Sequence, residues 1–165
     1  MGRLQHELRQ QKPFQGTAHE AVLALLRTTD VVRRQLATVV EPLGITLQQY
    51  NVLRILRGGG RAGVPTLEVA SRMIEQAPGI TRLLDRLEAK GLVRRERCPK
   101  DRRQHLCWVT PAGDALLQDL DAPMLAAGEA RMKPLRNQER MEFIRLLDAI
   151  RAQCESNNEQ SRGES

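Results

Sequence analysis

The sequence predicts a mostly α-helical protein with one small β-hairpin. Aromatic residues make up only 2% of the 165 residues, and runs of β-branched residues are scarce, whereas helix formers such as leucine, alanine and arginine are abundant. Two short extended runs near residues 92–110 enclose a basic, turn-prone segment, which predicts the hairpin. The length is that of one domain with a core of its own.

We expect residues 1–16 to form a polar N-terminal arm. The chain then runs Thr-Ala-His-Glu from Thr17 to Glu20, which is typical of a capping box, where a threonine hydroxyl and a glutamate carboxylate each accept a backbone amide. An apolar stripe at helical spacing follows, so a first helix is predicted. Pro42 and Gly44 end this helix.

A second capping box, from Thr46 to Gln49, predicts a second helix, which the three glycines at 58–60 end. These glycines lack the Gly-Lys-Ser/Thr sequence that a phosphate-binding loop needs. Thr66 is placed to cap a short third helix that continues through Met73.

The fourth and fifth helices flank the hairpin. Pro78 suits the first turn of the fourth helix. The two strands are expected within 92–98 and 104–110. Thr110 and Pro111 supply an N-cap and a first-position proline for the fifth helix.

We expect Pro123 to kink or interrupt the fifth helix. A sixth helix is predicted from Asn137 to Cys154, and residues 155–165, which lack large apolar groups, are predicted to be a disordered tail. Residues 17–154 then form a single domain. A short helix, a tight turn, a longer helix and a β-hairpin, in this order, indicate a winged helix-turn-helix among six helices.

The net charge is +6, and the basic side chains are concentrated in the middle of the chain. Residues 61–113 carry a net charge of +5, whereas residues 114–165 carry −3. This asymmetry favours one face built for a polyanion such as double-stranded DNA, because nucleic-acid affinity depends on phosphate neutralisation. A solvated run of surface charge is the alternative.

The fourth helix is the candidate DNA-recognition helix. Leu83, Leu84 and Leu87 would hold it on the core, so that its other face points outward. Two arginines one turn apart on that face suit the major groove, where arginine donates to guanine O6 and N7. Salt bridges on a solvated helix are the alternative. The predicted major-groove residues are Pro78, Gly79, Thr81, Arg82 and Arg86.

The tip of the hairpin is the candidate wing. Asp101 stands two residues before Arg103, so its carboxylate can accept backbone amides and leave the arginine projecting toward a narrow minor groove. A solvated turn is the alternative. Thr66 and Lys90 are predicted to contact the DNA backbone. The predicted wing contacts are Arg97, Lys100, Asp101, Arg102 and Arg103.

Four short stretches carry a family resemblance. The chain reads ITLQQY at 45–50, TRLLDRLEAKGLV at 81–93, DRR at 101–103 and VTPAG at 109–113. In this order, and across residues 17–152, these stretches resemble the multiple-antibiotic-resistance regulator (MarR) family. The second stretch followed by an Asp-x-Arg wing is more specific than a bare helix-turn-helix.

The resemblance implies an obligate homodimer, with dimerisation helices in 17–57 and 111–154 and a winged lobe at 61–110. It implies a transcriptional regulator, more often a repressor, on a pseudo-palindromic operator. It also implies release by a small aromatic or amphipathic effector, with no cofactor. We expect the inward side of helices 17–41 and 46–57 to wall the effector pocket, whose residues the sequence does not identify.

Two positions depart from the family or suggest other chemistry. Trp108 stands where relatives often carry Lys or Arg, and we expect its indole to lie exposed on the wing or to pack on Leu106 or the partner chain. Cys98, beside Arg97 and near Lys100, is the candidate redox-sensitive thiol. Inert cysteines are the alternative, because the family's sensing cysteine is usually in the first helix, which has none.

Other function classes have little support in the sequence. No Cys/His spacing matches a zinc site, and no arrangement typical of catalysis stands out, so we expect neither a metal nor an enzyme. With 3 cysteines, no secretory signal and no apolar stretch that could span a membrane, we expect a cytoplasmic protein. The remaining alternative is a winged-helix architectural or protein-interaction module that binds nucleic acid without sequence preference.

Overall fold

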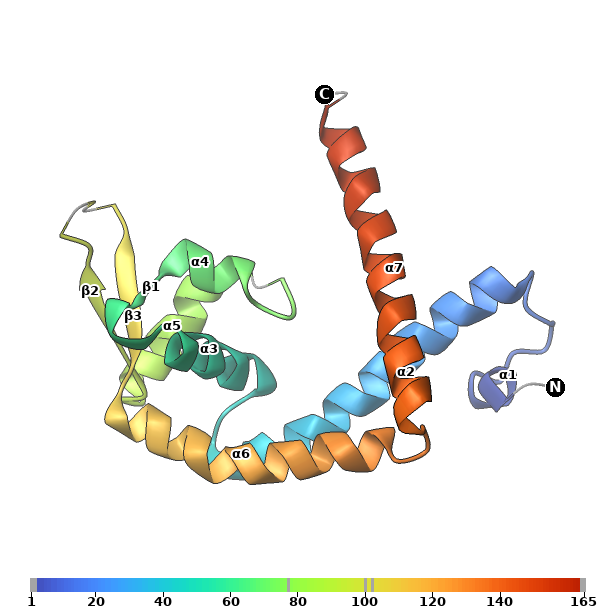
Figure 1. Ribbon diagram of the computed structural model, residues 1–165, viewed down its shortest axis with the longest axis horizontal. Coiled ribbons are helices and arrows are strands. Elements are labelled where there is room, and N and C mark those ends of the chain that lie inside the picture. The colour runs from blue at the N-terminus through green and yellow to red at the C-terminus, as the bar shows by residue number, and fades with distance from the viewer. Residues whose placement is uncertain (1–2, 77, 100, 102, 164–165) are drawn as a thin grey trace. The chain divides into compact units, whose positions relative to one another are not determined.

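The computed structural model describes residues 3–76, 78–99, 101 and 103–163, and it confirms a mostly helical fold with a small antiparallel sheet (Figure 1). The chain divides into two units, residues 1–125 and 126–165, which are described separately. The elements are α1 (Arg3–Glu7), α2 (Thr17–Val40), the 3-10 turn η1 (Glu41–Leu43), α3 (Leu47–Gly58), η2 (Gly60–Ala62), β1 (Val64–Pro65), α4 (Thr66–Ser71), α5 (Ile80–Ala89), β2 (Val93–Arg97), β3 (His105–Val109), α6 (Pro111–Met132) and α7 (Asn137–Gly163). None of the helices, as far as the chain is described, has the length and apolar character that crossing a membrane requires.

Two of the predicted helix caps form. The hydroxyl of Thr46 accepts the N–H of Gln49 at 3.2 Å, and the side chain of Gln49 accepts the N–H of Thr46 at 3.1 Å. The hydroxyl of Thr110 accepts the N–H of Gly113 at 3.1 Å at the start of α6. Both caps fix where a helix of the first unit begins.

Two other predicted caps are wrong. Gly16, with φ 143°, is the N-cap of α2, and its carbonyl accepts the N–H of Glu20, so Thr17 lies inside the helix and caps nothing. Pro65 is the N-cap of α4, because strand β1 runs directly into this helix. Thr66 is therefore the first helical residue rather than the cap.

Two helix boundaries also differ from those predicted, and α6 is not interrupted at Pro123. Helix α4 ends at Ser71, before Met73. The backbone N–H of Ile74 donates to the side chain of Asn51 at 2.9 Å and so does not continue the helix. Helix α5 begins after Pro78, with Gly79 as its N-cap. Helix α6 continues through Pro123, which is exposed, so the carbonyl that loses its usual donor is open to water.

The sheet has the order β1-β3-β2, with β3 in the centre. Its register places Cys107 of β3 opposite Val64 on one side and Arg95 on the other. Cys107 is fully buried, as are Leu84 and Leu87 of α5, which join the same core as α3 and the sheet. The predicted apolar face of the fourth helix is confirmed.

Helix α6 starts directly against the base of the hairpin. A Cβ atom on Gly113 would lie 2.3 Å from the carbonyl oxygen of Leu92 and 2.8 Å from Cγ2 of Val109. The hydroxyl of Thr110 also donates to the carbonyl of Gly91 at 2.6 Å. The helix and the hairpin therefore meet through backbone, and only glycine fits at position 113.

The second unit contains the end of α6 and helix α7. Arg140 pairs with Glu129 at 2.7 Å and donates to the carbonyl of Met132 at the end of α6 and to that of Leu135 in the turn, each at 3.1 Å. The predicted disordered tail is wrong over residues 155–163, which continue α7. This segment has no proline and no glycine before its last residue, so nothing in it stops a helix.

Candidate nucleic-acid interface

Helix α5 presents the polar face that its sequence predicts. Thr81, Arg82 and Arg86 are exposed, on the side opposite the buried leucines. Within the described part of the chain, no group accepts a hydrogen bond from the guanidinium of Arg82 or Arg86. The two arginines lie one helical turn apart and are available to an external acceptor.

The start of α5 is open as well. No side chain caps its first turn, and a Cβ atom on Gly79 would meet no described atom within 4 Å. Pro78 precedes this residue and is exposed. The first-turn amides and the positive end of the helix dipole are therefore accessible, an arrangement that favours phosphate.

Asp101 holds the turn of the wing, as predicted. Its Oδ1 accepts the N–H of Arg103 at 3.0 Å, and its carbonyl accepts the N–H of Gln104 at 2.9 Å. The N–H of Cys98 donates to the carbonyl of Gln104 at 2.9 Å and closes the hairpin. The side chain of Arg103 is exposed beyond this turn.

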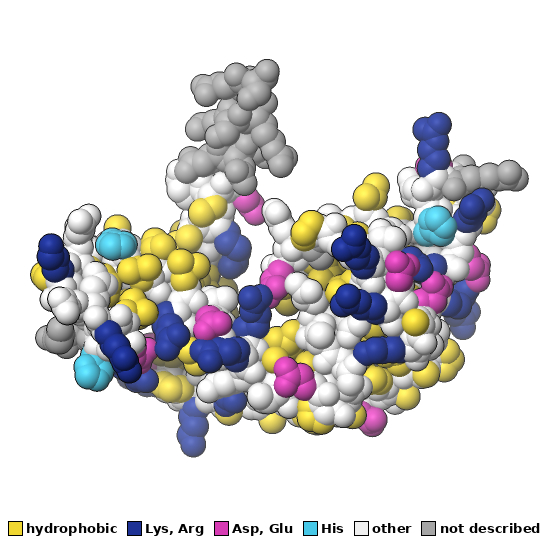
Figure 2. All heavy atoms as spheres, turned by 180° about the vertical axis from the view of Figure 1, so that it is seen from behind, with side chains coloured by type: hydrophobic (Ala, Val, Ile, Leu, Met, Phe, Trp, Pro, Cys, Tyr) yellow, Lys and Arg dark blue, Asp and Glu magenta, His cyan; other side chains and the backbone are white. Residues whose placement is uncertain are grey.

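Basic side chains lie over the lobe and at the tip of its hairpin (Figure 2). Arg97, at the end of β2, is exposed. Two further predicted wing contacts, Lys100 and Arg102, lie outside the described residues.

The two residues predicted to contact the DNA backbone have partners within the first unit of the chain. The hydroxyl of Thr66 donates to the carbonyl of His105 at 3.3 Å and lies 3.6 Å from Sγ of Cys107. The ammonium group of Lys90 donates to the carbonyl of Gly44, in the turn before α3. These contacts give Thr66 and Lys90 roles in holding the lobe together.

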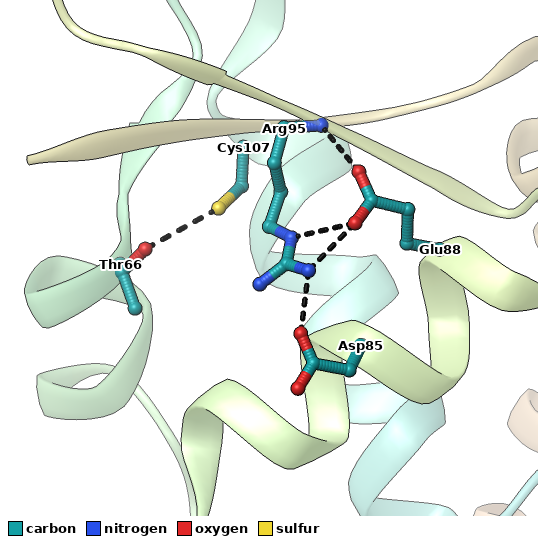
Figure 3. Close-up of polar contacts among 5 residues, drawn as sticks. All are labelled: Thr66, Asp85, Glu88, Arg95 and Cys107. Atoms are coloured by element: carbon teal, nitrogen blue, oxygen red, sulfur yellow. Dashed lines mark hydrogen bonds and ion pairs between the residues drawn. The ribbon is translucent and has the colours of Figure 1, made fainter.

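A network that joins the wing to α5 was not predicted from the sequence (Figure 3). The guanidinium of Arg95 donates to Glu88 at 2.6 and 3.0 Å and to Asp85 at 2.5 Å, and the backbone N–H of Arg95 donates to Glu88 at 3.1 Å. The hydrogen bond to Glu88, followed by that to Asp85, raises the pKa of this guanidinium. The alternation of β2 carries the missed signal, because it places Arg95 on the same inner face as the buried Val93.

Trp108 adopts an arrangement that the sequence did not predict. Its indole N–H donates to the carbonyl of Arg61 at 3.1 Å, and the ring lies over Gly63 in the loop before β1. The guanidinium carbon of Arg94 lies 4.2 Å from the ring centroid. The residue is half-buried and holds the base of the wing.

A cavity of about 260 Å³ lies where α2, α3 and α5 meet. Its walls come mostly from the two helices predicted to wall an effector pocket. Arg33 and Glu75, which both line it, form an ion pair 2.6 Å long, and the hydrogen bond from Arg33 lowers the pKa of Glu75. The lining residues are Arg33, Ala37, Thr46, Leu47, Gln48, Gln49, Glu75, Leu83 and Arg86.

The three cysteines differ in accessibility. Cys98 is half-buried, Cys107 is buried and Cys154 is exposed. Burial raises the pKa of the Cys107 thiol, which keeps it protonated at neutral pH. The described residues contain no cluster of His, Cys, Asp and Glu that could hold a metal ion.

Comparisons with known proteins agree with this geometry. The family model described as the MarR family matches residues 45–105. The crystal structure of a MarR transcription factor from Planctomyces limnophilus is 39% identical, covers 83% of this chain and 99% of its own, and has a TM-score of 0.64. The chain belongs to the MarR family.

Other similarities to known regulators extend over most of the chain. An uncharacterized HTH-type transcriptional regulator of Bacillus subtilis, YdgG, is 33% identical over 116 residues, which are 69% of this chain and 72% of that protein. A mutant MarR from E. coli, crystallised in a complex with operator DNA, is 26% identical with a TM-score of 0.71 and covers 77% of this chain and 90% of its own. As a MarR-family member, the chain is a winged helix-turn-helix transcriptional regulator and not an enzyme.

Proposed function

We propose that this MarR-family protein binds a specific operator, acting mainly as a repressor in the cytoplasm, with α5 in the major groove and the wing in the minor groove. The observation that carries the proposal is the pair of exposed arginines, Arg82 and Arg86, beside a wing turn that Asp101 fixes. Arginine at such a position donates to guanine O6 and N7. Arg103 follows the fixed turn and suits a narrow minor groove, whose negative potential attracts arginine.

A homodimer completes the proposed DNA-binding unit. Large apolar side chains are exposed on α2, where Val22 is 55% and Leu26 62% exposed, and on α7, where Met141 is 64% and Ile144 57% exposed. Exposed apolar faces of this kind favour burial against a second copy. A two-fold dimer would place two α5 helices on half-sites about one DNA turn, ~34–36 Å, apart.

The cavity between α2, α3 and α5 is the proposed effector site. Ala37, Leu47 and Leu83 offer apolar walls, and Arg33 and Arg86 offer charge, which suits a small aromatic or amphipathic compound. A ligand that prefers another spacing of the two lobes would weaken operator binding. Ala37→Leu should narrow the cavity and weaken the ligand response in an anisotropy assay while operator binding persists.

The deciding experiment is selection of bound sequences from a random duplex pool at near-physiological salt, followed by anisotropy titration. Recovery of an inverted repeat with half-sites one turn apart supports the proposal. Binding without a motif that collapses as salt rises would instead indicate an architectural or protein-interaction module. Sedimentation of the same sample tests the homodimer.

A further inference from the structure

The linker between α4 and α5 is held by polar side chains from two other helices. Arg33 of α2 lies 2.6 Å from Oε1 of Glu75, and Gln48 of α3 donates to Oε2 of the same carboxylate at 3.2 Å. The adjacent amide, that of Ile74, donates to Asn51 of α3 at 2.9 Å. Both carboxylate oxygens and one backbone amide of the linker are therefore engaged.

Apolar burial does not hold this part of the linker. The side chain of Ile74 is 87% exposed, and that of Glu75 is 34% exposed. Among the linker residues that the structure describes, Met73, two positions before Glu75, is the last one packed against the core. At Ile74 and Glu75 the linker is therefore held by polar contacts, and the pair of Arg33 and Glu75 is the charged one among them.

The same contacts bear on the position of α5. Glu75 stands four residues before Gly79, the N-cap of α5, and Arg86 of α5 lines the same cavity as Arg33 and Glu75. At the other end of α5, Lys90 donates to the turn before α3. Glu75, before the start of α5, is thus paired with α2, and Lys90, at the end of α5, contacts the turn that follows α2.

We infer that Arg33 is a positioning residue for operator binding, which ties α2 to the segment leading into α5 and thereby places Arg82 and Arg86 for base contact. This inference rests on the proposed function. Arg33 acts through Glu75 and not through phosphate, so it affects the preference for the operator over random DNA more than it affects affinity for DNA in general.

The test reverses the charges of the pair separately and together, in the full chain. Arg33→Glu and Glu75→Arg should each weaken operator binding by about tenfold, and the double variant, which has the net charge of the wild type, should return to within about threefold. Arg34→Glu is the matched control, because Arg34 is the next residue of α2 and pairs with Asp30 of its own helix at 2.8 Å. It should change affinity by no more than about threefold.

Three readouts keep the test decisive. The slope of log affinity against log salt should be the same in Arg33→Glu and Arg34→Glu, because neither side chain neutralises a phosphate. The ratio of operator to random-duplex affinity should fall in Arg33→Glu and in Glu75→Arg but not in Arg34→Glu. Without DNA, amides of the linker and of α5 should exchange hydrogen faster in Arg33→Glu than in Arg34→Glu, and the double variant should recover protection.

Several outcomes would overturn the inference. Equal losses in Arg33→Glu and Arg34→Glu would make the effect one of net charge, and a shallower salt slope in Arg33→Glu alone would make Arg33 a phosphate contact. Failure of the double variant to recover would show that the pair does not act as a unit. If the wild type shows no operator preference, the proposed function fails, and unchanged hydrogen exchange in Arg33→Glu would then overturn the positioning role independently.

Discussion

Trp108 covers Gly63 so closely that a methyl group on Gly63 would lie 2.4 Å from Cε2 of the indole. Gly63 also has φ 73° and ψ 167°, a conformation that other residues rarely adopt. Arg94 lies on the ring, and the carbonyl of Arg61 accepts its N–H. The base of the wing is thus attached to the loop before β1 by one aromatic side chain.

Gly63→Ala should therefore destabilise the lobe by roughly 1–3 kcal/mol, from backbone strain and from displacement of the indole. Trp108 is the only tryptophan in the chain, so its emission should shift to the red as the ring becomes hydrated. Urea denaturation followed by fluorescence measures both effects. Gly60→Ala is the matched control, because Gly60 also has a positive φ, 57°, but open space around its Cβ position. Equal stability and emission in the two variants would contradict the packing role of Trp108.

Arg95→Ala should destabilise the protein by about 1–3 kcal/mol, because it removes hydrogen bonds to Glu88 and Asp85 and leaves two carboxylates on α5 without their cation. Arg97 of the same strand is exposed and serves as the control, and Arg97→Ala should cost less than about 0.5 kcal/mol. Chemical denaturation checks both values. Similar losses in the two variants would show that the network contributes little beyond surface charge.

Arg82→Ala should weaken binding to the selected operator by roughly 1–3 kcal/mol and relax the preference for one base pair. Random duplex should lose much less affinity, because base contacts carry the sequence information. Repeating the selection with the variant identifies the position affected, and Arg34→Ala controls for the loss of one positive charge. A loss of equal size on every sequence would make Arg82 a phosphate contact.

Arg103→Ala should reduce affinity most for operators with an A·T-rich flank, where a narrow minor groove attracts arginine. Asp101→Ala should have a similar but smaller effect, since it frees the turn that its Oδ1 holds at 3.0 Å. Asp101→Asn keeps an acceptor and should retain most of the binding. Titrations against operators that differ only in their flanks measure the loss of affinity in each variant. A loss that does not depend on the flanking sequence would refute the minor-groove assignment.

The cysteines should react with a thiol reagent in the order of their exposure at neutral pH. Cys154 should be labelled first, Cys98 more slowly, and Cys107 only on unfolding, because burial raises the pKa of its thiol and excludes the reagent. Peptide mass spectrometry after timed labelling resolves the three sites. Fast labelling of Cys107 in the folded protein would show that the centre of the sheet opens locally.

Local patterns predict local structure well in this chain. The Thr46–Gln49 box and the two hairpin strands form as predicted, because their partners lie within a few residues or across one turn. The same four-residue pattern fails at Thr17, where Gly16 provides the N-cap and the helix begins one residue earlier. A capping pattern indicates which residues could be the N-cap. The backbone conformation of the residue before them determines which one is.

The candidate DNA-binding surface is predictable to a similar extent. The helical periodicity is enough to predict that Arg82 and Arg86 are exposed. The spacing of Asp101 and Arg103 predicts the hydrogen bond that fixes the turn of the wing. The contact between Arg33 and Glu75 spans 42 residues. Hydrophobic periodicity cannot predict a pair so far apart in the sequence. The contact depends on where the rest of the fold places α2 and the linker.

The backbone junction at Gly113 has a consequence for protein engineering. A Cβ atom at position 113 would meet the carbonyl of Leu92 and the side chain of Val109, so the fit of α6 against the hairpin requires glycine here. A winged lobe cut at this glycine should be transferable onto the long helices of a related regulator that has glycine at the same place and leucines that fill the core positions of Leu117 and Leu120. Chimeras joined there would exchange operator choice between proteins while each recipient keeps its own mode of assembly.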